Sequence, residues 1–280
     1  WSLSSARRSV PDCQSIVKKA AASRLGAKYG LAWLPETGPE RRIRFSILND
    51  ECRIYLDSSG AALHKRGYRP AHNAAPLRET LAAAMVDIAG YRGRGELADP
   101  FCGSGTIAIE AALAAKGRAP GINRSFAAER WENVPAAVWR AEREAARARE
   151  FSGEYRIYAA DIDARAVAMA RENARRAGVE RYIDFAVADA RRFCRATENG
   201  VIVTNPPYGE RMLEREGARE LLRAFGAAWR ATSWRLALLT SDTEAEALLG
   251  ARAAKRRKLY NGTIKCALYL CGAAREGAGK

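Results

Sequence analysis

The sequence lacks the features on which membrane-spanning, secreted and zinc-binding proteins depend. No stretch approaches the roughly 18 consecutive apolar residues of a membrane span, and the N-terminal "WSLSSARRSVPDC" has no apolar core of a signal peptide. The 6 cysteines form no C-x-x-C pair, and the chain has 2 histidines. We therefore expect no membrane span, no metal site, and free thiols in the reducing cytoplasm. Because the chain begins with Trp1 rather than methionine, we expect it to be part of a longer protein.

Acidic residues are scarce relative to basic ones. The 280 residues include 47 Lys+Arg and 32 Asp+Glu, a net charge of +15. This excess favours a polyanionic partner, nucleic acid first and an acidic membrane surface second. The alternative is a protein whose arginine content reflects an Arg-rich and Ala-rich proteome. Hydrophobic residues make up 48%, so we expect one large folded domain, alone or with a smaller one.

The N-terminal part has its own pattern. Residues 12–25 place apolar side chains on one helical stripe and are followed by Gly26. Residues 41–60, "RRIRFSILNDECRIYLDSSG", alternate apolar and polar positions on both sides of a polar turn, which predicts a β-hairpin. With 13 Lys/Arg and 6 Asp/Glu, residues 1–75 carry a net charge of +7. A basic helix with a hairpin suits an RNA backbone, although an ordinary solvated surface would have the same pattern.

The rest of the chain alternates helix and strand. After a helix over 76–90 that Pro76 opens, we expect strands at 97–101, 156–161, 182–187, 200–205, 235–240, 257–261 and 264–271. Helices are expected at 105–116, 164–177, 217–230 and 243–250, with a mostly helical insertion at 118–155. Such alternation predicts an α/β fold with a mostly parallel seven-stranded sheet covered on both faces. Asn261-Gly262 between the last two strands predicts a hairpin, so the last strand is antiparallel to its neighbour.

A glycine loop follows the first strand of this sheet. In "ELADPFCGSGTIAIEAA" (96–112), Gly103 and Gly105 allow a tight turn and the close approach of a ligand before a helix begins. The loop has no lysine of a P-loop, which argues against nucleotide hydrolysis. Asp99 ends the strand, where a carboxylate would repel a pyrophosphate but would suit a cationic amino group.

Acidic residues follow three successive strands. Asp99 ends the first, Asp161 ends the second within "YAADID", and Asp189 follows the third within "VADA". Each alone is often a helix N-cap, as Asp163 is expected to be. Together, at the carboxyl edge of a parallel sheet, they fit S-adenosylmethionine, with Asp161 accepting from the ribose hydroxyls and Asp189 reading the adenine amine.

The fourth strand ends in Asn205-Pro206-Pro207-Tyr208. The side-chain oxygen of Asn205 and the carbonyl of Pro206 can accept both N–H groups of an exocyclic aromatic amine, which draws its lone pair out of the ring. The two prolines stiffen the acceptors, and Tyr208 supplies a face on which a base can stack. A rigid structural turn is the plainer interpretation of these four residues.

These motifs resemble a known family. "DPFCGSGT" followed by "NPPYGERM" resembles the class I S-adenosylmethionine-dependent amino-methyltransferases. "LHKRGYRPAHNAAPLRETLAAAMV", "APGINRSFAAERW" and "DIDARAV" are similar to the THUMP-domain RNA methyltransferases that modify guanine N2 in bacterial 23S ribosomal RNA. The resemblance implies a Rossmann-like domain over 96–280, a connecting segment at 66–95, and the later part of a THUMP-like RNA-binding domain at 1–65.

The resemblance also implies a set of site residues. Asn205, Pro206, Pro207 and Tyr208 would hold the target base. The residues expected to bind the cofactor are Pro76, Leu77, Asp99, Pro100, Phe101, Cys102, Gly103, Ser104, Gly105, Thr106, Asp161, Ile162, Asp189, Ala190 and Asn205.

We expect an RNA partner, no metal and no membrane. The substrate implied is ribosomal RNA, with tRNA guanine N2 as an alternative. A DNA adenine-N6 methyltransferase and a protein glutamine methyltransferase use a similar N-P-P-Y segment, but no target-recognition domain is evident and a protein substrate would not call for +15. An RNA-binding module without activity would have lost the acceptors that this chain retains.

Overall fold

A computed structural model describes residues 9–35, 37–69, 77–208 and 212–272. Backbone contacts divide the chain into two units, one formed by residues 1–62 with 125–141 and the other by 63–124 with 142–280. The sequence analysis assigned all of 118–155 to the methyltransferase domain, whereas its central part, 125–141, clusters with the N-terminal unit. The two units are described in turn.

The N-terminal unit is built on a helix and a hairpin. Helix α1 (Val10–Tyr29) precedes strands β1 (Arg42–Leu48) and β2 (Glu51–Asp57), which pair antiparallel. Asn49 and Asp50 form the two-residue turn with φ of 50° and 60°, the left-handed conformation that Asn and Asp tolerate best after glycine. The predicted helix and hairpin are therefore both present.

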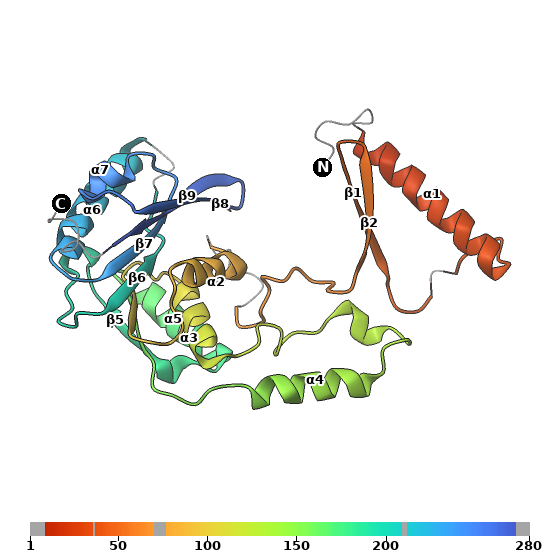
Figure 1. The fold of residues 1–280 in the computed structure, drawn as a ribbon, viewed down its shortest axis with the longest axis horizontal. Helices are drawn as coiled ribbons and strands as arrows, with labels where there is room; N and C mark the ends of the chain where they lie inside the picture. The colour runs from red at the N-terminus through yellow and green to blue at the C-terminus, as the bar shows by residue number, and fades with distance from the viewer. Residues whose placement is uncertain (1–8, 36, 70–76, 209–211, 273–280) are drawn as a thin grey trace. The chain divides into compact units, whose positions relative to one another are not determined.

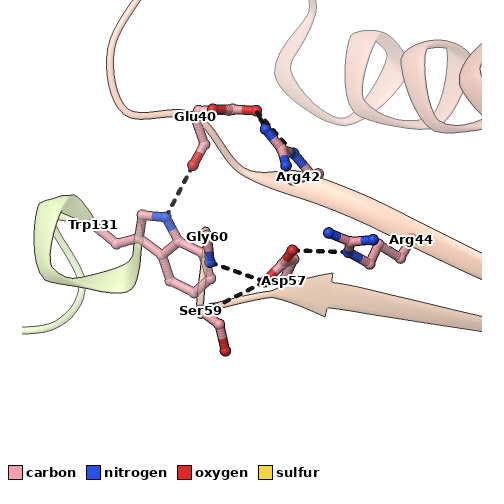
Figure 2. Close-up of polar contacts among 7 residues, drawn as sticks. All are labelled: Glu40, Arg42, Arg44, Asp57, Ser59, Gly60 and Trp131. Carbon is pink, nitrogen blue, oxygen red and sulfur yellow. Dashed lines mark hydrogen bonds and ion pairs between the residues drawn. The ribbon is translucent and has the colours of Figure 1, made fainter. Parts of the chain in front are cut away.

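The later segment of this unit is tied to the end of the hairpin. The backbone N–H groups of Ala127 and Ala128, at the short 3-10 helix η1 (Ala127–Arg130), donate to the carbonyls of Ser59 and Ser58 at 3.3 and 3.1 Å. Figure 2 shows a second link, in which the Trp131 indole N–H donates to the Glu40 carbonyl at 3.2 Å. These bonds explain why a segment far along the chain belongs to this unit.

Asp57 closes the hairpin. Its carboxylate accepts the backbone N–H groups of Ser59 and Gly60 at 3.0 and 3.1 Å and pairs with Arg44 of the neighbouring strand at 2.8 Å (Figure 2). These bonds lower the pKa of Asp57, with the Arg44 bond as the largest cause. The carboxylate thereby fixes the exit of β2.

The second unit contains the seven-stranded sheet (Figure 1). Its spatial order is β5-β4-β3-β6-β7-β9-β8. The pairs among the first five of these strands are parallel, and β9 runs antiparallel to both β7 and β8. The predicted α/β fold is thus confirmed, including its antiparallel last strand. The strands are β3 (Glu96–Asp99), β4 (Arg156–Asp161), β5 (Ile183–Val187), β6 (Gly200–Thr204), β7 (Arg235–Thr240), β8 (Lys255–Asn261) and β9 (Ile264–Cys271).

Helices cover both faces of the sheet. One core cluster joins the sheet to α2 (Glu79–Ile88), α3 (Thr106–Lys116) and α5 (Ala164–Ala177). The other joins it to α6 (Met212–Arg230) and α7 (Ala245–Leu249). Helix α4 (Ala136–Ala148) has no buried residue. None of the helices in the described ranges is long and apolar enough to cross a bilayer.

Two predicted helix starts differ from the structure. Helix α6 begins at Met212 rather than 217, because Gly217 lies inside the helix instead of opening it. Helix α2 begins at Glu79, and Pro76, which was expected to open it, lies outside the described residues.

Buried ion pairs fix the segment that leads into α2. Glu110 of α3, 3% exposed, accepts the Tyr68 hydroxyl at 3.0 Å and lies 3.5 Å from Arg66. Arg69 pairs with Glu79 at 3.1 Å and donates to the Leu77 carbonyl at 2.9 Å. Burial raises the pKa of Glu110, and its partners oppose that shift. The network places the residues just before α2 at the carboxyl edge of the sheet.

Candidate active site

The site begins where β3 and β6 lie side by side. These strands are parallel neighbours, although β4 and β5 come between them in the chain. The strand order therefore reverses here, and ligands bind at such switch points in open α/β sheets. The Thr204 hydroxyl at the end of β6 donates to the Asp99 carboxylate at the end of β3 at 2.7 Å. Asn205 follows directly.

The glycine loop is held from behind by β4 and α5. The Gly103 N–H donates to the Asp161 carboxylate at 2.9 Å, and Asn173 of α5 donates to the Ser104 carbonyl at 3.0 Å. Gly105 has a φ of 82°, and a Cβ there would lie 2.9 Å from the Cβ of Ala170. Gly105 is thus needed for the packing of the loop on α5. Gly103, with a φ of 50°, would have no atom within 4 Å of its Cβ, so its open side is free for a ligand.

Asp99 is a buried carboxyl. It is 1% exposed, and burial raises its pKa to about 7, aided by the nearby Asp161. The Thr204 hydroxyl and the Phe101 N–H act in the opposite direction. A buried carboxylate becomes favourable when a cation lies beside it, so Asp99 is suited to an ammonium group.

Asp161 and Asp189 already have backbone partners. Asp161 accepts the N–H groups of Gly103 and Asp163 at 2.9 and 3.0 Å. Asp189 caps the short 3-10 helix η3 (Ala190–Arg192), accepting the Arg191 N–H at 2.9 Å, and pairs with the Arg191 side chain at 2.6 Å. A carboxylate has about four acceptor positions, so both residues retain acceptors for a ligand.

The segment after β6 combines buried and open positions. Pro206 is buried and Pro207 is exposed, whereas Asn205 and Tyr208 are half-buried. The Tyr208 hydroxyl donates to the Asn205 side-chain carbonyl, and the ring packs against the core. Burial and the neighbouring Cys266 raise the pKa of Tyr208. Tyr208 therefore positions Asn205 as well as presenting part of its ring.

Two cavities adjoin at this edge. The larger, of about 920 Å³, is lined by Leu77, Asp99, Phe101, Cys102, Gly103, Ser104, Thr106 and all four residues of the Asn205–Tyr208 segment. The smaller, of about 320 Å³, is lined by Pro100, Asp161, Ile162, Asp189 and Ala190, and shares Phe101, Asn205 and Pro207 with the larger. The structure thus brings together the candidate residues except Gly105, which lies behind the loop, and Pro76, which is outside the described residues.

Sequence reasoning missed part of the lining of the larger cavity. Its wall also includes Arg78, Ile107, Glu214, Gly217, Ala218, Leu221, Asn261, Gly262 and Ile264. Asn261-Gly262 was identified as a hairpin turn, but its place at the cavity follows from the position of β9 between β7 and β8. In the described part of the chain, no group of three or more His, Cys, Asp or Glu side chains could hold a metal ion.

Comparisons with known proteins agree with this architecture. Residues 66–269 match the UPF0020 family, described as the RMKL-like methyltransferase domain. A Bacillus subtilis (strain 168) protein named "Putative RNA methyltransferase YpsC" is 44% identical over 96% of this chain and 71% of its own length. The ribosomal RNA large subunit methyltransferase K/L of Shewanella baltica (strain OS195) is 42% identical over 82% of this chain. The match covers 34% of that relative, about a third of its length.

Two solved structures share the fold closely. The crystal structure of SMU.472 complexed with SAH has a TM-score of 0.89 and 37% identity, over 97% of this chain and 73% of that one. The structure of a predicted N6-adenine-specific DNA methylase from Listeria monocytogenes has a TM-score of 0.90 and 42% identity, over 97% and 71%. With the glycine loop, the acidic strand ends and the Asn205–Tyr208 segment at one edge of the sheet, the chain belongs to the family of RMKL-like methyltransferase domains.

Proposed function

We propose that this protein transfers a methyl group from S-adenosylmethionine to the exocyclic N2 amine of a guanosine in RNA, with ribosomal RNA as the substrate. The observation that carries the proposal is the shared cavity, in which the glycine loop after β3 and the Asn205–Tyr208 segment after β6 line one space. The names of the YpsC and K/L relatives support an RNA substrate. The net charge of +15 suits a polyanion.

The residues of the two cavities fit S-adenosylmethionine. The buried Asp99 suits the ammonium group, and the open side of Gly103 leaves room beside it. Asp161 and Asp189 supply acceptors for the ribose hydroxyls and the adenine amine, next to the apolar Ile162. When bound, the cofactor supplies an electrophilic methyl group on a sulfonium. The SAH complex of the SMU.472 neighbour supports this assignment.

Asn205 and Pro206 act on the target amine. The side-chain oxygen of Asn205 and the carbonyl of Pro206 accept its two N–H groups, which makes the nitrogen pyramidal and frees its lone pair. The Tyr208 hydroxyl holds the Asn205 oxygen through one lone pair, and the second lone pair serves the amine. Since Pro206 and Pro207 restrict the backbone, these acceptors are preorganised before the base enters.

The N6 amine of adenine is the second candidate. It offers the same two N–H groups, and the Listeria neighbour is described as a predicted methylase of that amine in DNA. Guanine N2 in tRNA is a third, since the same amine occurs there. The product nucleoside and the nucleic acid that carries it separate the three.

We predict that Asp161→Ala weakens S-adenosylmethionine binding. Loss of a charged acceptor typically costs roughly 1.5–3 kcal/mol, or about 10- to 150-fold in affinity. Asp163→Ala is the matched control, because Asp163 caps α5 and lines neither cavity. Isothermal calorimetry that finds equal affinities for the two variants would remove Asp161 from the ribose role.

We predict that S-adenosylmethionine affinity falls as the pH drops through about 7. Burial raises the pKa of Asp99 to about 7, and the ammonium group binds the ionised form. Affinity should therefore fall about tenfold for each pH unit well below that value. Asp99→Asn should bind weakly at pH 8 and lose this dependence between pH 6 and 8. A wild-type affinity that is constant over this range would contradict the assignment of Asp99.

We predict that Asn205→Ala separates binding from chemistry. The variant retains Asp99, Asp161 and the glycine loop, so its cofactor affinity should match that of the wild type. It loses a preorganised acceptor of the amine, which typically lowers the rate about 10²- to 10³-fold. Single-turnover kinetics and calorimetry on the same preparation measure both quantities.

Replacement of the target guanosine by inosine tests the acceptor atom. Inosine lacks the N2 amine and retains the ring nitrogens and the ribose, so transfer should stop. Efficient methylation of the inosine-containing RNA would show that a ring nitrogen or a ribose is the acceptor, and would overturn the assignment of N2.

A further inference from the structure

Strand β8 is the edge of the sheet and leads directly to the larger cavity. It ends the strand order, pairing with β9 alone, and its turn places Asn261, Gly262 and Ile264 in the cavity wall (Figure 1). Four consecutive basic residues, Lys255–Lys258, are all exposed on this strand. A basic edge and the candidate active site are therefore parts of one continuous surface.

The two faces of β8 differ. Side chains alternate along a strand, so Lys255 and Arg257 share a face with Leu259, which packs against the core, and with Asn261, which is 8% exposed. Successive side chains on one face are about 7 Å apart, which puts Arg257 about 13 Å along the strand from Asn261. Arg257 and Lys255 thus form a row that leads away from the cavity along the strand.

The opposite face is already engaged. Arg256 donates to the Glu246 carboxylate at 3.1 Å and lies over the Tyr269 ring at 5.4 Å. Lys258 lies over the Tyr260 ring, 5.4 Å from its centroid. By contrast, within the described ranges no carboxylate lies within salt-bridge distance of Lys255 or Arg257. The charge of this row is available to an external anion.

We propose that Lys255 and Arg257 bind the phosphates of the RNA that flank the target nucleotide and lead that nucleotide to the cavity. The proposal rests on the proposed function, since it assigns a path to the same substrate. The row lies on the cavity-wall side of β8, and phosphate contacts fix the register of a nucleic acid on its protein. The other explanation is that charges on an edge strand only prevent pairing with another sheet, and it predicts no effect on RNA.

Two charge-matched double variants test the row. Lys255→Gln with Arg257→Gln removes the row, and Arg256→Gln with Lys258→Gln removes two charges from the opposite face of the same strand. All four positions are exposed, so both variants should fold. The probe is a single-stranded RNA of about 12 nucleotides. Its binding is measured by fluorescence anisotropy from 50 to 200 mM salt.

The row variant should lower the slope of log affinity against log salt by about 1.4, or roughly 0.7 for each phosphate contact. At about 0.1 M salt this corresponds to roughly a 25-fold loss of affinity. The KM for RNA should rise with kcat and S-adenosylmethionine affinity unchanged. The opposite-face variant should retain the wild-type slope. Equal losses in the two variants, or no loss in the row variant, would overturn the proposal.

The binding measurement needs no turnover. If the wild-type protein methylates no guanosine but the row variant alone loses RNA affinity, the proposed function fails and the row stands as an RNA site. If methylation proceeds with equal KM in both variants, the proposed function stands and the row is excluded.

Discussion

The neighbouring positions of β3 and β6 are the constraint on which the rest of the site depends. Because the strand order reverses between them, the glycine loop and the Asn205–Tyr208 segment, about a hundred residues apart in the chain, open into one cavity. The hydrogen bond from Thr204 to Asp99 joins the two strand ends directly. A cofactor-binding loop and an amine-holding loop are useful to each other only in this arrangement.

The acidic residues at the strand ends serve the fold and the ligand together. Asp161 accepts the Gly103 N–H and so shapes the loop that it would share with the cofactor, and Asp189 caps η3. Asp99 is buried and has a raised pKa, which makes its ionised form unfavourable until a cation lies beside it. A perturbed carboxyl at a cavity is typical of a binding site rather than of a purely structural core.

Much of the fold was predictable because the strands and helices have regular periodicities and the turns have specific residues. The β8–β9 hairpin followed from Asn261-Gly262, and the glycine loop and N-P-P-Y segment identified the site. The long-range packing was not predictable. Gly105 is required by Ala170 of α5, and residues 125–141 join the N-terminal unit through bonds to Ser58 and Ser59. Nor could the sequence show that β9 enters between β7 and β8 and that the β8–β9 turn reaches the cavity wall.

The central claim is that the cavity methylates an exocyclic amine of RNA. The most direct measurement incubates the protein with S-adenosylmethionine labelled in the methyl group and with RNA, DNA and protein in separate reactions, followed by digestion of the labelled polymer to monomers. The account predicts label in RNA alone, recovered as N2-methylguanosine. Label recovered as N6-methyladenine from DNA, or as a methylated amino acid from protein, would contradict it.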